Sequence, residues 1–286
     1  MTEGLLVLQS DFGISDGAVS AMHGVANSVQ RGLPIFDLTH QIPQYNIWEA
    51  SYRLLQTINY WPEQTVFVSI VDPGVGSDRK SVVAQTVKGQ YIVTPDNGTL
   101  THVNKFIGIK EVREIDETVN RLPNSGESHT FHGRDIYAYT GARLASGFIP
   151  FEDVGPSLPL SSIIEFPLKD STFENEELAG IVDIIDRPFG NLWTNISRTQ
   201  FKQLDAVYGE SFQVSISTNG HTIYENALLY GRSFAATNVG EPLLYVNSLD
   251  NIAIAINQQS FAETYGVGTG MNWEVIIRKT SPAVVN

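Results

Sequence analysis

The segment Ser69–Lys80, SIVDPGVGSDRK, ends an apolar run of β-branched residues that begins at Thr65. The run stops at a carboxylate, a proline and two glycines, and the chain then continues through Asp78, Arg79 and Lys80. In an α/β sheet, a strand that ends this way forms a rigid loop at the carboxyl edge, where ligands bind. An isolated Asp-Pro-Gly would favour a simple turn. Similar polar loops recur along the chain, however, and they favour a ligand-binding edge: Asp11-Phe-Gly, Pro95-Asp-Asn-Gly, Phe131-His-Gly-Arg-Asp and Phe189-Gly-Asn-Leu-Trp-Thr-Asn.

The N-terminal half of the chain alternates short apolar runs with segments of helical periodicity. Buried parallel strands have continuous apolar sequences, and the helices between them carry one apolar face. The expected strands are Leu5–Gln9, Leu33–Leu38, Thr65–Val71, Ser81–Thr86, Gln90–Val93 and, at an edge, Glu111–Asp116. The longer expected helices are Ala18–Val29, Asn46–Ile58 and Ile136–Ser146. Strands that alternate with helices predict an α/β domain with a mainly parallel central sheet over residues 1–165.

The C-terminal part of the chain has a different character. Four prolines fall between Pro150 and Pro167, and an acidic, polar segment follows them. This composition predicts a linker between domains at residues 166–177. Beyond it, short β-rich segments are separated by turn signals such as Asn219-Gly220. The pattern predicts an all-β, antiparallel, barrel-like domain over residues 178–286.

Composition limits the classes of partner and the compartment. The net charge is −13 and Lys and Arg form no cluster, so we expect no nucleic-acid partner. The chain has no cysteine, which excludes disulfides and thiolate metal sites. No apolar run approaches the length of a membrane span, and the N-terminus lacks the basic region of a signal peptide. We therefore expect a cytoplasmic protein with no membrane partner.

Three polar side chains are expected at strand or helix ends on one edge of the sheet: Asp72, Arg79 and His132. A histidine hydrogen-bonded to a carboxylate can orient a water molecule or take its proton, and a guanidinium nearby can fix the carboxylate. Each residue also has a simpler explanation. Asp72 could form a turn, Arg79 could be a solvated charge, and His132 could begin a helix. Convergence of the three is therefore a hypothesis.

Three further carboxylates, Asp11, Asp16 and Asp186, follow apolar runs and lie close to glycine or to a Phe-Gly pair. Carboxylates of this kind can bind ribose hydroxyls or an ammonium group, which makes them candidate binding residues. Asp16 could equally cap the helix expected at Ala18–Val29. Aromatic residues near the same loops, Tyr45, Trp193 and Phe234, could stack on a purine or a sugar, or pack in the core.

A metal site is the alternative use of these polar groups. Asp11 and Asp72 could bind a divalent ion together with Asn97 and His132. Their spacing matches no dedicated metal motif. The pair His129-x-x-His132 is only a weak zinc signal, because no third ligand has suitable spacing. We therefore expect no metal site.

In their order and spacing, the motifs together resemble one family, the S-adenosyl-L-methionine (SAM) hydroxide adenosyltransferases. These are adenosine-forming SAM hydrolases and relatives of the SAM-dependent fluorinase and chlorinase. The resemblance runs from about Leu5 to the C-terminus. It rests on Asp11-Phe-Gly with Asp16, Val71-Asp-Pro-Gly-Val-Gly with Arg79, Pro95-Asp-Asn-Gly, Phe131-His-Gly-Arg-Asp, and Asp186-x-Pro-Phe-Gly-Asn-Leu-Trp-Thr-Asn.

The resemblance implies an activity, an assembly and a set of residue roles. SAM would be the substrate, no cofactor would be needed, and homotrimers would hold each SAM between the N-terminal domain of one subunit and the C-terminal domain of the next. Asp72, Arg79 and His132 would position and activate the water that attacks C5′ of the ribose. The implied substrate contacts are Asp11 to the ribose, Asp16 and Asp186 to the methionine end, Asn191 to adenine, Tyr45, Trp193 and Phe234 to the ring faces, and Gln258 after Ile254-Ala-Ile-Asn257.

The chain departs from the halogenating relatives at three positions. The halogenating relatives have Tyr at the positions of Asp72 and His132. The fluorinase also has Ser at the position of Gly133, and it has an extra loop that is absent here. A carboxylate beside a halide pocket would repel chloride or fluoride, so hydrolysis is favoured over halogenation. A SAM or adenosine sensor with negligible turnover is the other alternative. Segment Ser260–Gly270 matches the family pattern poorly.

Overall fold

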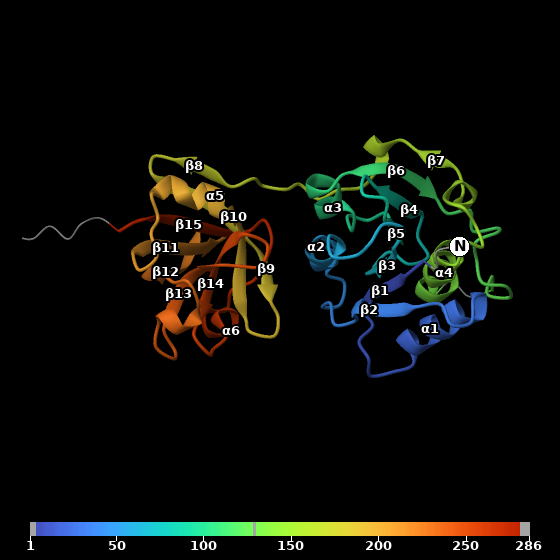
Figure 1. The fold of residues 1–286 in the computed structure, drawn as a ribbon, viewed down its shortest axis with the longest axis horizontal. Helices are drawn as coiled ribbons and strands as arrows, with labels where there is room; N and C mark the ends of the chain where they lie inside the picture. Colours follow the sequence, from blue (N-terminus) through green and yellow to red (C-terminus); the bar gives the residue numbers. More distant parts are fainter. Residues whose placement is uncertain (1–3, 128–129, 281–286) are drawn as a thin grey trace, which may run out of the picture. The chain divides into compact units, whose positions relative to one another are not determined.

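The computed structural model describes residues 4–127 and 130–280, and the chain divides into two compact units between Phe166 and Pro167 (Figure 1). We call them the N-terminal unit and the C-terminal unit. Among the residues so described, no helix has the length and apolarity that a membrane crossing requires.

The N-terminal unit is built on a seven-stranded sheet. Its strands, in order across the sheet, are β2 (Ile35–Thr39), β1 (Leu6–Ser10), β3 (Val66–Ile70), β5 (Tyr91–Pro95), β4 (Ser81–Thr86), β6 (Ile109–Glu114) and β7 (Ser157–Leu158). The first four are parallel to one another, whereas β4, β6 and β7 pair antiparallel. The α/β prediction with a mainly parallel central sheet is therefore confirmed. The antiparallel side arises because a short turn with Gly89 at φ 80° joins β4 to β5.

Helices cover both faces of this sheet (Figure 1). One face carries α1 (Ala18–Val29), the π-helix η1 (Gly133–Ala138) and α4 (Tyr139–Ala145), and the other carries α2 (Ile47–Ile58) and α3 (Thr101–Phe106). Strand β1 shows the cause. Leu6 and Leu8 pack with the first set of helices and Val7 packs with the second, so the strand begins with three consecutive apolar residues.

The C-terminal unit is a closed barrel of seven strands. In order around the barrel these are β10 (Asn191–Ser197), β14 (Asn251–Ile256), β13 (Pro242–Val246), β12 (His221–Tyr230), β11 (Ser211–Thr218), β15 (Trp273–Lys279) and β9 (Glu177–Asp186), and β9 pairs with β10 to close the ring. Alternate residues such as Phe212, Val214 and Ile216 fill its core. The barrel-like prediction is confirmed, although β12 and β13 run parallel.

The segment predicted as a linker, residues 166–177, contains a strand. Strand β8 (Thr172–Glu174) pairs antiparallel with β9 on the outside of the barrel. It has only three residues, of which Phe173 alone is apolar and packs against the barrel core, so the sequence shows no recognisable strand pattern. The remaining short helices are α5 (Arg198–Phe201), α6 (Phe261–Tyr265), η2 (Phe151–Val154), η3 (Leu160–Ser162), η4 (Lys202–Leu204) and η5 (Phe234–Ala236).

Candidate functional site

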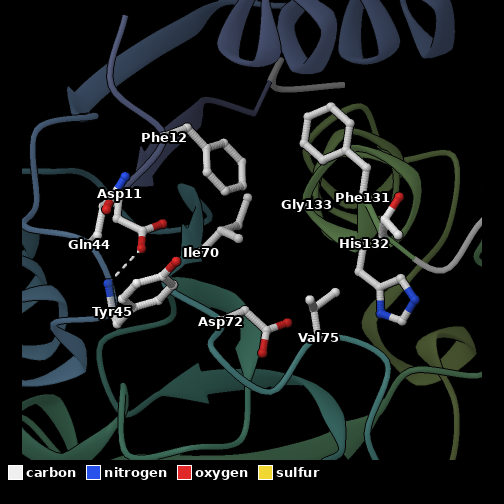
Figure 2. A pocket seen from close by; sticks show the side chains of 11 residues that line it. Asp11, Phe12, Gln44, Tyr45, Ile70, Asp72, Val75, Phe131, His132 and Gly133 are labelled. Carbon is white, nitrogen blue, oxygen red and sulfur yellow. Dashed lines mark hydrogen bonds between the residues drawn. The ribbon is translucent and has the colours of Figure 1, made fainter.

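A pocket of about 240 Å³ opens at the carboxyl ends of β1 and β3 (Figure 2). Asp11 directly follows β1, Asp72 lies just past the end of β3, and His132 immediately precedes η1. Asp11, Asp72 and His132 were each predicted as site residues, and all three line this pocket. Their meeting follows from the topology, because the carboxyl ends of parallel strands share one edge of the sheet.

Arg79 links Asp72 to His132. Its Nε donates to Oδ1 of Asp72 at 2.9 Å and its Nη2 donates to Oδ2 at 2.5 Å, which makes a bidentate pair. The same Nη2 donates to Nδ1 of His132 at 3.1 Å. The side chains of Arg79 and Asp72 are only 9% and 6% exposed. The three residues therefore converge, with the guanidinium joining the histidine to the carboxylate, whereas the sequence suggested a direct bond between those two.

The contact with Arg79 fixes the tautomer of His132. A guanidinium can only donate hydrogen bonds, so Nδ1 of His132 must accept and carries no proton. Burial lowers the pKa of His132 below its ordinary value, and the positive charge of Arg79 lowers the pKa further. At neutral pH the ring is therefore uncharged and its proton lies on Nε2.

Ser81 and Tyr137 hold Arg79 in place, and neither was identified from the sequence. Nη1 of Arg79 donates to Oγ of Ser81 at 3.0 Å, and that oxygen lies 3.1 Å from Oη of Tyr137. Burial raises the pKa of Tyr137 well above its ordinary value, so the phenol stays neutral. For Tyr137, the π-helix explains why the residue was not identified. Its i→i+5 bonds bring residues five apart, such as His132 and Tyr137, towards the same side, which α-helical spacing would not.

Asp11 and Tyr45 lie on the other side of the pocket from His132 (Figure 2). Oδ2 of Asp11 accepts a hydrogen bond from the backbone N–H of Tyr45 at 2.9 Å. Tyr45 has φ 67°, in the left-handed region, and its side chain is exposed. Such a conformation is uncommon for a residue other than glycine and often marks a functional loop. The two predicted binding residues are thus held next to each other.

Asp16 lies outside this pocket. Its Oδ1 accepts a hydrogen bond from the backbone N–H of Ala18, the first residue of α1, at 2.9 Å. Gly17 occupies the N-cap position itself. The alternative that Asp16 is the N-cap is therefore wrong: Asp16 lies one residue before the cap, and its side chain bonds to the first residue of the helix.

Three predicted residues of the C-terminal unit line a second pocket, of about 880 Å³: Asn191, Phe234 and Gln258. Gln258 lies just past β14 with φ 60°, so the chain turns sharply there. Asn257 fixes this turn, since its Nδ2 donates to the carbonyl of Thr237 at 2.8 Å. The volume lies within the range of small-molecule sites.

Asp186 and Trp193 are not part of the lining of the second pocket. Asp186 is the β-ladder partner of Asn191, which places it beside the pocket. Trp193 is buried and its Nε1 donates to Oη of Tyr245 at 3.1 Å. The ring of Tyr245 lies 5.0 Å from that of Phe234, and burial raises the pKa of Tyr245 to about 12. Tyr245 therefore contacts two predicted residues. Sequence analysis did not identify Tyr245, because it fits the ordinary alternation of side chains along strand β13.

The metal site considered from the sequence does not form in the described part of the chain. Asp11, Asp72 and His132 do not bring three ligand atoms within 4.8 Å of one another. The Asn97 side chain donates to a backbone carbonyl at 2.9 Å and accepts from a threonine hydroxyl at 2.8 Å. His129 lies outside the described residues. A different group, which sequence analysis missed, does converge: His23, Asp37 and His40.

Two family models match the chain. The model described as the SAM hydroxide adenosyltransferase N-terminal domain matches residues 6–155, and the model of the C-terminal domain of the same family matches residues 180–274. A solved structure, an uncharacterized conserved protein from Thermotoga maritima, has a TM-score of 0.85 and 32% sequence identity, and the match covers 96% of this chain and 100% of that one.

The curated relatives include SAM hydrolases and fluorinases. The chain is 35% identical over 218 residues to the (R)-S-adenosyl-L-methionine hydrolase of Methanocaldococcus jannaschii, covering 71% of this chain and 72% of the relative. It is 32% identical over 269 residues to the protein of the same name from Thermus thermophilus, with 92% and 95% covered. It is also 30% identical over 295 residues to a fluorinase of Actinopolyspora mzabensis, with 95% and 96% covered.

Proposed function

Because this chain belongs to the SAM hydroxide adenosyltransferase family, we propose that it hydrolyses S-adenosyl-L-methionine to adenosine and L-methionine. The observation that carries the proposal is the hydrogen-bonded chain Asp72–Arg79–His132 at the pocket of the N-terminal unit. Relatives named SAM hydrolase support the choice of substrate.

The proposed reaction is attack of water on C5′ of the ribose, in line with the sulfonium. As the O–C5′ bond forms, the C5′–S bond breaks and its electron pair leaves with sulfur, which gives the neutral thioether of methionine. The substrate already carries a cationic leaving group, so the reaction needs neither a metal nor a general acid at sulfur. The protein supplies orientation and a place for the proton of the water.

Asp72 is the proton acceptor in this proposal. Arg79 can only donate, and the Nδ1 lone pair of His132 is engaged by Arg79, so neither offers a free acceptor on the described contacts. One water proton passes to the carboxylate of Asp72 and then to solvent, and the other remains on the 5′-hydroxyl of adenosine. The Nε2–H of His132 donates to the attacking oxygen and orients its lone pair towards C5′.

The remaining predicted residues would bind the rest of the substrate. Asp11 would hold the ribose hydroxyls, Asp16 and Asp186 the methionine end, and Asn191 the adenine edge. The rings of Tyr45, Trp193 and Phe234 would face adenine and ribose, and Gln258 would add a contact. We also propose a homotrimer in which the N-terminal unit of one subunit and the C-terminal unit of the next complete each SAM site.

Hydrolysis is favoured over halide transfer by the groups at the pocket. The carboxylate of Asp72 lines it, and a negative charge there repels a halide ion but accepts a hydrogen bond from water. Gly133 is the second indication. A Cβ at Gly133 would lie 2.9 Å from Cζ of Phe12, so the serine of the fluorinase pattern requires this ring to move.

The test is turnover of SAM by the pure protein in 18O-labelled water, with the products identified by mass. We expect adenosine that carries the label in its 5′-hydroxyl, and we expect the His132→Ala variant to form almost none. The matched control is His221→Ala, which removes an exposed histidine on β12 and should leave turnover unchanged.

Three other outcomes would end the proposal. Adenosine formation no faster than that of His132→Ala would exclude catalysis by this site. SAM that binds but stays intact would instead indicate a sensor, and 5′-halo-5′-deoxyadenosine formed in chloride or fluoride would indicate a halogenase.

A further inference from the structure

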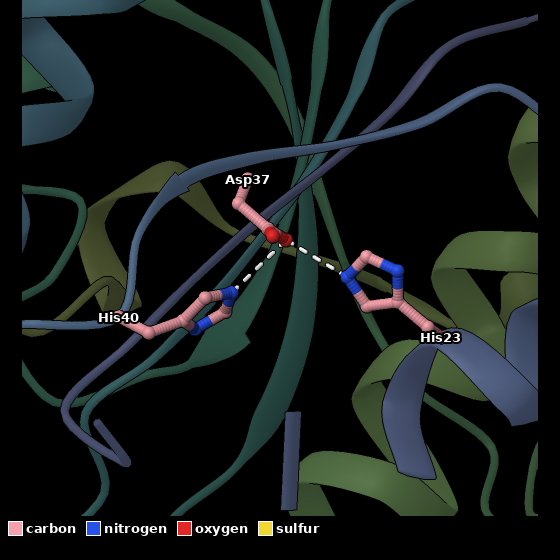
Figure 3. Close-up of side chains that lie close together, drawn as sticks. All are labelled: His23, Asp37 and His40. Atoms are coloured by element: carbon pink, nitrogen blue, oxygen red, sulfur yellow. Dashed lines mark hydrogen bonds and ion pairs between the residues drawn. The ribbon is translucent and has the colours of Figure 1, made fainter. Parts of the chain in front are cut away.

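Three side chains that can ligate a metal converge beside the edge strand β2 (Figure 3). His23 comes from α1, Asp37 from β2, and His40 from the segment after β2. Nε2 of His23 lies 2.9 Å from Oδ1 of Asp37, and Nε2 of His40 lies 3.1 Å from the same oxygen. The proposed hydrolysis uses none of the three.

The pleat of β2 explains why they meet. Side chains alternate along a strand, so Asp37 shares a face with Ile35, which packs in the core beneath α1. On α1, Met22 is buried against that core and His23 is its neighbour at the edge of the helix. His23 therefore approaches Asp37 from the helix, while the turn after β2 returns His40 to the same carboxylate from the other side (Figure 3).

We propose that His23, Asp37 and His40 bind a divalent transition-metal ion, with zinc as the best match. Two imidazoles and one carboxylate, with a further position for water, form a common donor set for zinc. Ligand atoms on a tetrahedral zinc ion lie about 3.3 Å apart, since each bond is about 2.0–2.2 Å. The N–O separations of 2.9 and 3.1 Å are only slightly shorter.

Because two of the three side chains are partly exposed, they can adjust to an ion, and the ion can enter the site from solvent. The side chains of His23 and Asp37 are 34% and 44% exposed, so their torsions can open the group by a few tenths of an ångström. The side chain of His40 is only 2% exposed and forms the fixed part of the site. The fourth position of the ion would face solvent.

Ser10 can support His40 in the metal-bound state. Oγ of Ser10 lies 2.7 Å from Nδ1 of His40, and a hydroxyl can donate or accept. With a metal on Nε2, His40 carries its proton on Nδ1 and donates it to Ser10, which is the outer partner that metal-binding histidines generally have.

The position of the site suggests a stabilising role. Oγ of Ser10 also accepts from the backbone N–H of Phe12 at 3.3 Å, and the carbonyl of His40 accepts from the N–H of Gly13 at 2.7 Å. Both bonds tie His40 to the loop that carries Asp11. An ion at His40 would therefore restrain that loop without touching the reacting atoms.

The test is metal binding to full-length protein that has been stripped with a chelator and freed of any histidine tag. Zn²⁺ is titrated by calorimetry, and Co²⁺ is titrated by its visible absorption. We expect one ion per chain and a Kd that rises at least about tenfold in His23→Gln and in Asp37→Asn. His221→Gln, at an exposed histidine of β12, is the matched control and should bind like the unchanged chain.

Thermal melting supplies a second measurement. Because only the folded site binds the ion, Zn²⁺ should raise the Tm of the unchanged chain and of His221→Gln, and it should raise the Tm of His23→Gln by less at the same concentration. Failure of the unchanged chain to bind either ion would overturn the proposal. An unchanged Kd in both His23→Gln and Asp37→Asn would do the same. These two positions are at least partly exposed, so they decide the matter even if His40→Gln does not fold.

Discussion

Arg79 donates to three side chains, Asp72, Ser81 and His132, and this geometry depends on the planar guanidinium. Lysine keeps the charge but offers a single nitrogen, so Arg79→Lys cannot make the bidentate pair and also orient His132. We expect kcat/KM for SAM to fall at least about 100-fold, equivalent to about 2.7 kcal/mol. Arg198→Lys, at an exposed ion pair with Asp250, is the control and should keep full activity. Near-normal activity of Arg79→Lys would contradict the proposed arrangement.

The pKa of His132 sets a pH limit on activity. The proposed mechanism needs the neutral ring, and burial together with Arg79 lowers the pKa below the ordinary value of 6.5. We expect kcat/KM to be constant around neutral pH and to fall only below pH 6.5. His132→Gln, whose amide can both accept from Arg79 and donate to water, should retain more activity than His132→Ala and should lose this inflection. Persistence of the same inflection in His132→Gln would assign it to another group.

The same shift affects stability, with a defined sign. Below about pH 6.5 the unfolded chain takes up a proton at His132 that the folded chain resists. The contribution of His132 to the free energy of unfolding is therefore lost as the pH falls from 6.5 towards the lowered pKa of the folded state. His132→Gln should reduce this loss in urea unfolding measured across that range.

At the scale of single residues, the sequence could predict Asp72, Arg79 and His132 because each follows or precedes a recognisable element. It could not predict their order of contact, since that depends on side-chain directions in two loops, the β3–β4 connection and the segment before η1. Tyr245 and the group of His23, Asp37 and His40 were missed for a related reason. The residues that Tyr245 contacts, and the three residues of the group, lie on different elements. Their spacings in the sequence match no motif.

Among the elements, α4 packs unusually close to the sheet at Gly141. A Cβ at this position would overlap Cγ2 of Val68 in β3, and it would lie 3.3 Å from Cδ1 of Leu6 in β1. We expect Gly141→Ala to lower the free energy of unfolding by about 1–3 kcal/mol, because overpacking outweighs the better helix propensity of alanine. Urea unfolding measures this change.

Gly24 of α1 is the matched control for Gly141. It lies within a helix, is exposed, and would place a Cβ in open space. Gly24→Ala should therefore raise the free energy of unfolding by about 1 kcal/mol through helix propensity alone. Equal effects of the two substitutions would show that α4 can move away from the sheet at little cost.

The elements that sequence analysis predicted well share a strong local signal. Val66–Ile70 is apolar at every position except Ser69, and the helix Ile47–Ile58 has one apolar face and an N-cap at Asn46 that accepts from Glu49. Strand β8 has no such signal, since it has only three residues, one of them apolar, and is held by its partner β9. The parallel pairing of β12 with β13 was missed because pairing direction is set by the whole barrel.

At the scale of the whole molecule, the proposed trimer predicts complementation between inactive variants. His132→Ala disables the N-terminal half of a site and Asn191→Ala the C-terminal half. If each site uses two subunits, random co-assembly of equal amounts should restore about a quarter of the sites. Activity of co-expressed mixtures, compared with the two variants expressed apart, measures this. Mixtures no more active than the separate variants would show that each site belongs to one chain.

The closure of the β-barrel has a consequence for solubility. An unpaired strand edge exposes backbone donors and acceptors, and it can template the addition of strands from other chains. In the described C-terminal unit the ring of seven strands pairs both edges of every barrel strand along part of its length, and the outer strand β8 is only three residues long. The C-terminal unit therefore exposes few unpaired strand edges to which another chain could add a strand in amyloid-like growth. When C-terminal units of different molecules meet at high concentration, we expect their contacts to be made by side chains.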